Sequence, residues 1–301
     1  MCQCSTERVG EPGSALRRPG LATRLCEVIV ARAPGPLLRP FVQGLWASDG
    51  GGPARGAGAR EHVLPTGLAQ LVLRLSPEPI LIFERGAPQS LGHAVLGGAR
   101  TGYYEKDVSA PSAAVGATLL PGAVSMLFGV RADELAERHT RLDELWGAEA
   151  GRLRERLAEQ RTAEARLDEL EAYLLRKLPE ARSLHAGVAG SLAQLGKGEV
   201  RIGELVRASG YSHRALVAAF RTAVGLAPKA FVNVLRFQRA LRSLAGAPRA
   251  SLVDAALGNG YSDQAHLTRA FAEMAGVSPA RYRALGLEHP NHVPIALPAR
   301  R

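Results

Sequence analysis

Short apolar runs separated by glycine and proline dominate the first 120 residues. They cover residues 25–30, 41–46, 68–75, 80–83 and 115–120. Apolar runs of four to eight residues between chain-breaking residues are typical of β-strands, and their regular recurrence indicates a barrel or a sandwich. We therefore predict a β-rich domain over residues 21–150 with a helical end, preceded by a disordered tail over residues 1–20.

The apolar spacing changes to a helical period after residue 150. A stripe at steps of three, four or seven residues runs from Leu153 to Leu178, and Glu164 interrupts it. The interruption argues against a clean coiled-coil seam. Two interpretations remain for this stripe, a helix that packs on its own domain or a helix that forms a dimer. We assign residues 151–195 to a helical linker.

The last hundred residues contain an internal repeat. Gly210-Tyr211-Ser212 recurs fifty residues later as Gly260-Tyr261-Ser262. Four further matches are 51 residues apart, namely Phe220 with Phe271, Gly225 with Gly276, Pro228 with Pro279, and Phe231 with Tyr282. One residue is therefore inserted in the second copy. Several matches in one register are more specific than a single shared tripeptide.

Each copy has the layout of a helix-turn-helix. In the first copy a short amphipathic segment leads to Gly210, which permits a tight turn, and Ser212 is a good cap for the next helix. Gly260 and Ser262 take the same parts in the second copy. Residues 231–241 between the copies predict one continuous amphipathic helix. Two recognition helices held by such a helix can enter major grooves about 34 Å apart.

The charge of the chain is concentrated in this repeat region. The net charge is +10, and residues 196–301 carry 15 Lys and Arg against 6 Asp and Glu, while residues 1–150 carry 15 of each. Such an asymmetry indicates a C-terminal domain that binds a polyanion, either nucleic acid or a membrane surface. No apolar stretch is suited to a signal peptide or a spanning helix, so we predict a cytoplasmic protein without a membrane partner.

Residues 199–285 resemble the DNA-binding domain of the AraC/XylS family of bacterial transcriptional regulators. The resemblance rests on residues 260–271, Gly-Tyr-Ser-Asp-Gln-Ala-His-Leu-Thr-Arg-Ala-Phe, and on the segment over residues 276–283 that follows. It implies an all-α domain of two helix-turn-helix units joined by a long helix, which we assign to residues 196–286. A tail is expected over residues 287–301.

The N-terminal half resembles a widespread, uncharacterised sensor-like domain. The similar segments are residues 36–46, 62–67 and 116–123. This resemblance implies a cupin-like β-barrel with a helical end, in agreement with the strand pattern. The predicted fold class of the whole chain is therefore α+β.

The candidate DNA contacts are the outward-facing positions near the start of each recognition helix. They are His213, Arg214, Val217, Ala218 and Arg221 in the first helix, and Gln264, Ala265, Thr268 and Arg269 in the second. Arginine pairs with guanine and glutamine with adenine, so Arg214, Gln264 and Arg269 are the leading candidates for base contacts. Arg221 is better suited to a phosphate, and Asp263 to a capping role rather than to a cytosine contact.

The predicted function is a sequence-specific transcription regulator whose partner is double-stranded DNA. A small-molecule effector, RNA polymerase as a further partner, and a monomeric or homodimeric state all remain open. Two alternatives stand beside it: an enzyme domain with an accessory DNA-binding module, and a ligand-independent DNA-binding protein whose barrel only dimerises. The sequence has no Gly-x-Ser-x-Gly, P-loop or dinucleotide fingerprint, so we expect neither enzymatic activity nor a cofactor.

The cysteines and histidines of the N-terminal half do not form a metal-binding pattern. Cys2, Cys4 and Cys26 are odd in number and clustered near one end, which fits a reducing compartment, and no Cys-x2-Cys motif follows the Cys2-x-Cys4 pair. His62 and His93 are not part of a His-x-His motif. We expect no metal site, and the role of the three cysteines remains open.

Overall fold

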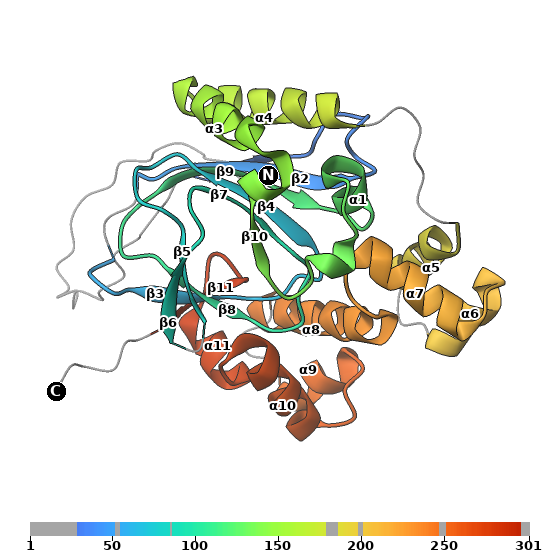
Figure 1. Cartoon of the computed structure of the whole chain (residues 1–301). Coiled ribbons are helices and arrows are strands. Elements are labelled where there is room, and N and C mark those ends of the chain that lie inside the picture. The colour runs from blue at the N-terminus through green and yellow to red at the C-terminus, as the bar shows by residue number, and fades with distance from the viewer. Residues whose placement is uncertain are drawn as a thin grey trace, which may run out of the picture.

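The computed structural model describes residues 29–51, 55–84, 86–178, 186–197, 201–246 and 251–295. A region rich in β-strands comes first and a helical region follows, which confirms the predicted α+β class. Figure 1 shows the strands in two layers, with one pair of helices above them and the C-terminal helices below and to one side. We call the described part of residues 29–178 the β-domain.

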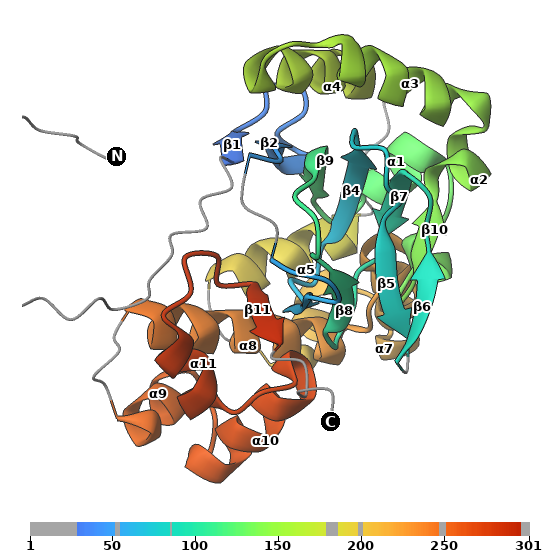
Figure 2. The same cartoon turned by 90° about the vertical axis from the view of Figure 1, so that its left-hand side faces the viewer.

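The strands form two antiparallel sheets that face one another (Figures 1 and 2). The six-stranded sheet has the order β1 (Ile29–Arg32), β2 (Val42–Asp49), β9 (Ala113–Leu119), β4 (Ala69–Arg74), β7 (Ala94–Gly97) and β10 (His139–Arg141). The five-stranded sheet has the order β11 (His292–Ile295), β3 (Arg60–Val63), β8 (Tyr104–Asp107), β5 (Leu81–Glu84) and β6 (Ala87–Ser90).

Alternating side chains of the central strands build the core of the β-domain. Leu71 and Leu73 of β4 are fully buried, as are Val115 and Ala117 of β9. Residues two apart on a strand point to the same face, so the strands present one continuous apolar face. Gly116 lies between two of these residues, where a Cβ would approach the Trp46 ring to 2.3 Å. Only glycine leaves room for this ring.

Two helices predicted as part of a linker belong to the β-domain instead. The region over residues 151–178 divides into α3 (Ala148–Glu159) and α4 (Ala163–Lys177), after α1 (Ala123–Phe128), the 3-10 turn η1 (Ala132–Glu134) and α2 (Leu142–Trp146). Leu153, Leu157, Leu167 and Leu174 are completely buried in the core that the six-stranded sheet also forms. The apolar stripe therefore packs on its own domain, which confirms that interpretation. Residues 179–185 lie outside the described residues.

The C-terminal region consists of seven helices among the described residues. They are α5 (Ala186–Lys197), α6 (Ile202–Ser209), α7 (His213–Val224), α8 (Pro228–Gly246), α9 (Leu252–Gly258), α10 (Gln264–Ala275) and α11 (Pro279–Leu285). Val188 and Leu195 of α5 are buried in one core with Leu205 and Phe220. The helical domain thus starts earlier than the predicted boundary at residue 196, because α5 packs on the first helix-turn-helix.

The segment predicted as a C-terminal tail from residue 287 contains a strand. β11 pairs with β3 in antiparallel register, with Val293 opposite His62 and Pro294 opposite Glu61. Val293 is fully buried among residues of the second helix-turn-helix and Leu64. The tail prediction was wrong because the pairing strand lies more than two hundred residues away in the sequence. Residues 296–301 are outside the described part.

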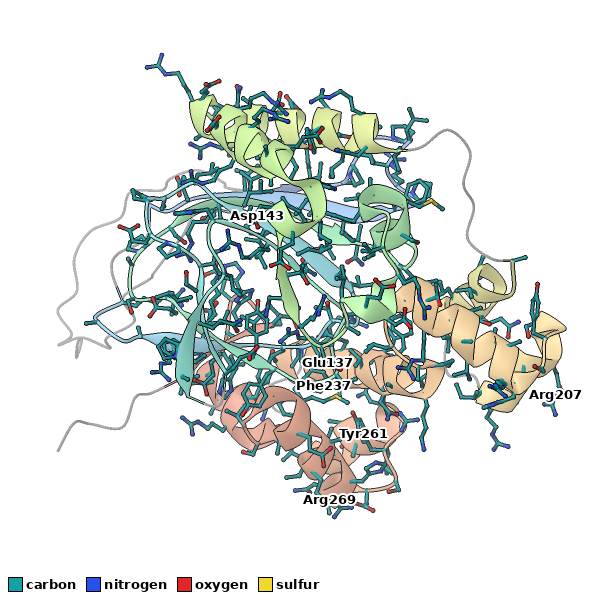
Figure 3. The ribbon with its side chains drawn as sticks, in the orientation of Figure 1. Glu137, Asp143, Arg207, Phe237, Tyr261 and Arg269 are labelled. Atoms are coloured by element: carbon teal, nitrogen blue, oxygen red, sulfur yellow. The ribbon has the colours of Figure 1, made fainter. Side chains whose placement is uncertain are left out.

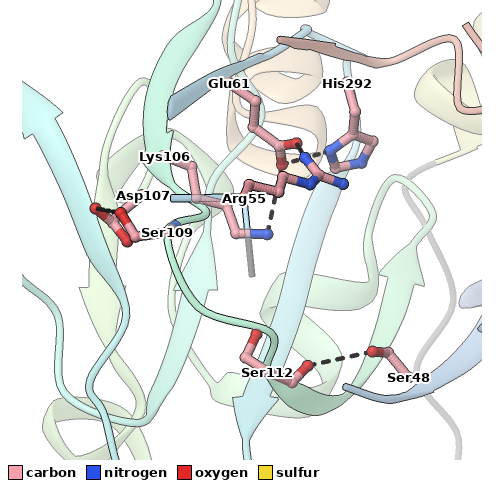
Figure 4. Close-up of polar contacts among 8 residues, drawn as sticks. All are labelled: Ser48, Arg55, Glu61, Lys106, Asp107, Ser109, Ser112 and His292. Atoms are coloured by element: carbon pink, nitrogen blue, oxygen red, sulfur yellow. Dashed lines mark hydrogen bonds and ion pairs between the residues drawn. The ribbon is translucent and has the colours of Figure 1, made fainter. Parts of the chain in front are cut away.

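A charged cluster accompanies this strand pairing (Figure 4). Glu61 on β3 is almost completely buried. His292 Nδ1 donates to Glu61 Oε1 over 2.8 Å, and Arg55 Nη1 lies 3.2 Å from Glu61 Oε2. Lys106 Nζ lies 3.6 Å from Glu61 Oε1. Burial alone would raise the pKa of Glu61, but the hydrogen bond from His292 and the nearby positive charges lower it to about 2.

Within the described part of the chain, no single helix is long and apolar enough to cross a membrane. The helices α7 and α8 reach the required length and composition only as a pair, and they are bent by 54° relative to each other.

Candidate nucleic-acid interface

Local sequence signals fix the start and end of both recognition helices. Ser212 caps α7 by accepting a hydrogen bond from Ala215 N over 3.2 Å. Gly210 ends α6 with a φ of 71°, in the left-handed region that glycine adopts most easily. The predicted turn and cap of the first unit are confirmed.

The cap of the second unit differs from the prediction by one residue. The cap of α10 is Asp263, whose Oδ1 accepts from His266 N over 2.7 Å. Ser262 instead donates to Asp263 Oδ2 over 3.0 Å. The one-residue insertion therefore lies between the turn and the helix, so that α10 begins 51 residues after α7. The capping interpretation of Asp263 is confirmed, whereas the cap role of Ser262 was wrong.

Each unit has its own apolar core, and the two cores repeat the same ring contact. Phe220 and Phe231 meet edge to face with centroids 5.7 Å apart, and Phe271 and Tyr282 do so at 5.3 Å. Leu216 of α7 and Leu267 of α10 are buried on the inner faces of the two recognition helices. These anchors fix which face of α7 and of α10 points to solvent.

The structure places the predicted contact residues at the surface of the two helices. His213, Arg214, Ala218 and Arg221 are exposed on α7, as are Gln264, Ala265 and Arg269 on α10, while Val217 and Thr268 are partly exposed. Figure 3 shows Arg269 at the lower edge of the molecule, on the side of α10 that points away from the sheets. Thr268 Oγ1 donates to Gln264 O over 2.8 Å, so its hydroxyl is engaged within the helix.

The outward face of α7 shares a hollow with the β-domain. A cavity of about 470 Å³ is lined by all five predicted α7 residues together with Arg131 and Asp133 from the segment around η1. Arg131 holds Asp133 through two hydrogen bonds, Nε to Oδ1 at 3.0 Å and Nη2 to Oδ2 at 2.6 Å. The hydrogen bond from Arg131 is the main cause that lowers the pKa of Asp133, and the charge of Arg221 contributes.

Sequence reasoning missed Arg131 and Asp133. They lie about eighty residues before α7 and belong to a different domain, so periodicity does not connect them with the recognition helix. Their spacing, Arg-x-Asp, recurs at Arg141 and Asp143, where the same side-chain contacts form away from α7. Only the tertiary structure shows that the first pair lies beside α7 and that the second does not.

A polar cluster lies between the two sheets of the β-domain. Arg100 Nη2 donates to His139 Nδ1 over 3.3 Å, and the Arg100 guanidinium lies 4.4 Å from the centre of the Tyr104 ring. Burial and the charge of Arg100 lower the pKa of His139 to about 3, and burial raises the pKa of Tyr104 to about 12. Among the described residues, no carboxylate lies within 4.0 Å of the Arg100 guanidinium, and the charges of Glu137 and Glu84 act on it from farther away.

The described residues contain no group of three or more His, Cys, Asp or Glu side chains suited to a metal ion. Cys2, Cys4 and Cys26 lie outside the described residues. Glu61 and His62 belong to β3 and are covered by C-terminal residues.

Comparison with known proteins agrees with this division of the chain. Residues 205–285 match a family described as a helix-turn-helix domain, and residues 31–141 match a domain of unknown function (DUF6597). Over 88 residues the chain is 36% identical to the HTH-type transcriptional regulator MtrA of Neisseria gonorrhoeae, a match that spans 29% of each chain. The helix-turn-helix match thus covers both recognition helices, in the part of the chain where the sequence motifs predict such units. The chain thus covers less than a third of that curated relative.

Solved structures of ToxT from Vibrio cholerae are similar to the chain over a larger part. One covers 77% of this chain and 97% of its own, with a TM-score of 0.42 and 9% identity. Another, with unsaturated fatty acid bound, covers 76% and 96% with a TM-score of 0.40 and 10% identity.

Proposed function

We propose that this chain is a sequence-specific DNA-binding transcription regulator that reads successive major grooves with α7 and α10. The observation that carries the proposal is the duplicated, capped recognition helix, which exposes Arg214 in one copy and Gln264 and Arg269 in the other. Arginine and glutamine are the side chains that most often recognise guanine and adenine in the major groove. The excess of nine positive charges in residues 196–301 supplies the attraction to phosphates.

The experiment is a selection from random DNA duplexes followed by substitution of Arg269. Full-length protein should enrich a sequence with two half-sites, and Arg269→Ala should weaken binding to it by about 1–3 kcal/mol while relaxing the base preference at one position. Arg152→Ala is the matched control, since Arg152 is exposed on α3, and Figure 1 shows α3 and α10 on opposite sides of the molecule. An equal loss on random and selected DNA would show that Arg269 does not read bases.

We also propose that the β-domain senses a small anionic molecule between its sheets. The Arg100, Tyr104 and His139 cluster supports this, because a half-buried guanidinium attracts an anion when the carboxylates that act on it, Glu84 and Glu137, stay outside ion-pair distance. Neutral His139 and Tyr104 would add one hydrogen-bond donor each. The effect on DNA binding would come from a different affinity of the anion for two arrangements of the chain.

A further inference from the structure

The first recognition helix ends against the β-domain. Gly122 N donates to Ala223 O in the last turn of α7 over 2.8 Å. A Cβ on Gly225, which follows α7, would lie 3.1 Å from Ala132 O, so the backbone of η1 is in close contact with the end of the helix. Carbonyls in the last turn of a helix lack partners within it. The β-domain supplies one of these partners.

The second recognition helix ends against the same domain in an equivalent way. His62 Nδ1 lies 2.9 Å from the carbonyl oxygen of Ala275, the last residue of α10. Since a carbonyl only accepts, His62 donates this hydrogen bond. The His62 ring is almost completely buried and lies against Tyr103, with ring centroids 3.9 Å apart. Gly276 is the repeat partner of Gly225, and a Cβ there would lie 2.4 Å from the His62 ring.

The linking helix α8 is held to the β-domain between these two ends. Gln238 Nε2 donates to Pro65 O and to Asn291 Oδ1, each over 2.8 Å. A Cβ on Gly67 would lie 3.1 Å from the ring of Phe231, so the same loop also contacts the first turn of α8. The β-domain thus spans the full distance from the first helix-turn-helix to the second (Figure 2).

These contacts give the two recognition helices a second structural connection besides α8. One path between the recognition helices runs along α8, and the other runs from Gly122 through the β-domain to His62. A single connecting helix leaves each unit able to tilt at its end of the helix, whereas a second rigid path removes that freedom. One base pair changes a half-site position by about 3.4 Å and by about a tenth of a turn of the double helix, so small tilts decide which spacing fits.

We propose that the β-domain is a brace that fixes the distance between α7 and α10 and thereby selects the spacing of the two half-sites, with His62 as a positioning residue. The effect on half-site spacing rests on the proposed DNA-binding function. The mechanical part, the fixed distance between α7 and α10, does not. The spacing preference is then a property of the β-domain as much as of the helical domain. His62 acts through α10 and does not itself contact DNA.

The mechanical part is tested by electron spin resonance distances in full-length protein. Spin labels are attached at Ala215→Cys on α7 and Ala272→Cys on α10, both exposed positions outside the predicted contacts, after Cys2, Cys4 and Cys26 are replaced by serine. His62→Leu removes the donor, and His62→Asn retains one near the position of Nδ1. We expect a narrow distribution of label-to-label distances for the protein with His62 unchanged and for His62→Asn. For His62→Leu we expect a distribution at least about twice as broad.

The DNA part uses duplexes carrying the half-sites recovered in the selection, at the recovered spacing and with one base pair added or removed. Protein with His62 should lose at least about tenfold in affinity when the spacing changes, and His62→Leu less than about threefold. Thermal unfolding verifies that each variant is folded. If His62→Leu does not fold, Tyr103→Leu removes the ring packed on His62 and takes its place.

The outcomes separate the two proposals. A folded His62→Leu protein with an unchanged distance distribution and an unchanged spacing preference overturns the brace. If the protein enriches no DNA sequence, the proposed DNA-binding function is overturned. A broadened distance distribution in His62→Leu would then still support the brace. Equal behaviour of His62→Leu and His62→Asn would also overturn the role of the hydrogen bond.

Discussion

Glu61 is a buried carboxylate beside Arg55, Lys106 and His292. Its pKa of about 2 lies below the ordinary value of 4.5, so the folded state favours the ionised form. A lowered carboxylate pKa stabilises the fold above the ordinary pKa, and this contribution is lost as the pH falls toward the folded value. The loss therefore develops between about pH 5 and pH 2 and amounts to about 3 kcal/mol.

We expect Glu61→Gln to flatten this part of the stability profile. Urea unfolding between pH 6 and pH 3 should show a smaller loss of unfolding free energy in Glu61→Gln than in the unchanged protein, by about 2 kcal/mol. Glu155→Gln, at an exposed position of α3, is the control and should follow the unchanged protein. Parallel profiles for all three proteins would contradict the strong ionic role of Glu61.

The two recognition helices do not carry equivalent side chains. With the offset of 51 residues, Arg214 corresponds to Ala265, and Arg269 corresponds to Ala218. The arginine predicted to contact a base therefore lies one helical turn farther along α10 than along α7. Periodicity around the buried Leu216 and Leu267 was enough to predict which residues are exposed, because a single helix repeat determines its outer face. We infer that the two half-sites differ in sequence.

The segment around η1 brings an acidic side chain beside the outer face of α7. Asp133 lines the same hollow as Arg214 and Arg221. If α7 enters a major groove as proposed, a carboxylate at that position repels the neighbouring DNA phosphates and neutralises part of the charge of Arg131.

We expect Asp133→Asn to tighten DNA binding by about two- to fivefold at low salt, since a single charge near the protein surface contributes modestly. The control is Asp143→Asn, because Asp143 makes the same contacts with Arg141 and lies away from α7 (Figure 3). Affinity measured by fluorescence anisotropy distinguishes the two. An equal effect of both substitutions would mean that η1 does not face DNA.

Elements with strong local signals were predictable, and those determined by distant contacts were not. Gly210, Ser212, Gly276 and Pro279 indicated helix ends directly from residue chemistry. The strand β11 has no such signal, since its residues become a strand only when they pair with β3. The start of α10 was predicted one residue too early because an inserted residue moves the cap without changing the motif around it.

At the scale of the whole molecule, the two domains share their cores. Ala99 is buried with the first helix-turn-helix, and Leu64 with the second. The domain types were predictable from sequence because each has its own apolar period. Their docking was not, since it depends on isolated residues such as His62 and Gly122 whose partners lie far along the chain.

Such docking would give the anion proposed for the β-domain a direct route to the two recognition helices. We expect a small carboxylate or phosphate compound to raise the melting temperature by about 2–4 °C at saturating concentration. Arg100→Gln should abolish this rise. Differential scanning fluorimetry with a panel of anions makes the measurement, and a rise that persists in Arg100→Gln would place the anion elsewhere.

The pairing of β11 with β3 also sets the order in which the two domains can complete their folding. Synthesis delivers β3 early, but the strand beside it and the histidine that holds Glu61 follow more than two hundred residues later. A growing chain therefore carries an open sheet edge at β3, and Glu61 lacks one of its positively charged partners, until β11 leaves the ribosome. The five-stranded sheet is complete only after β11 of the C-terminal region has paired with β3, so the two domains complete their folding together.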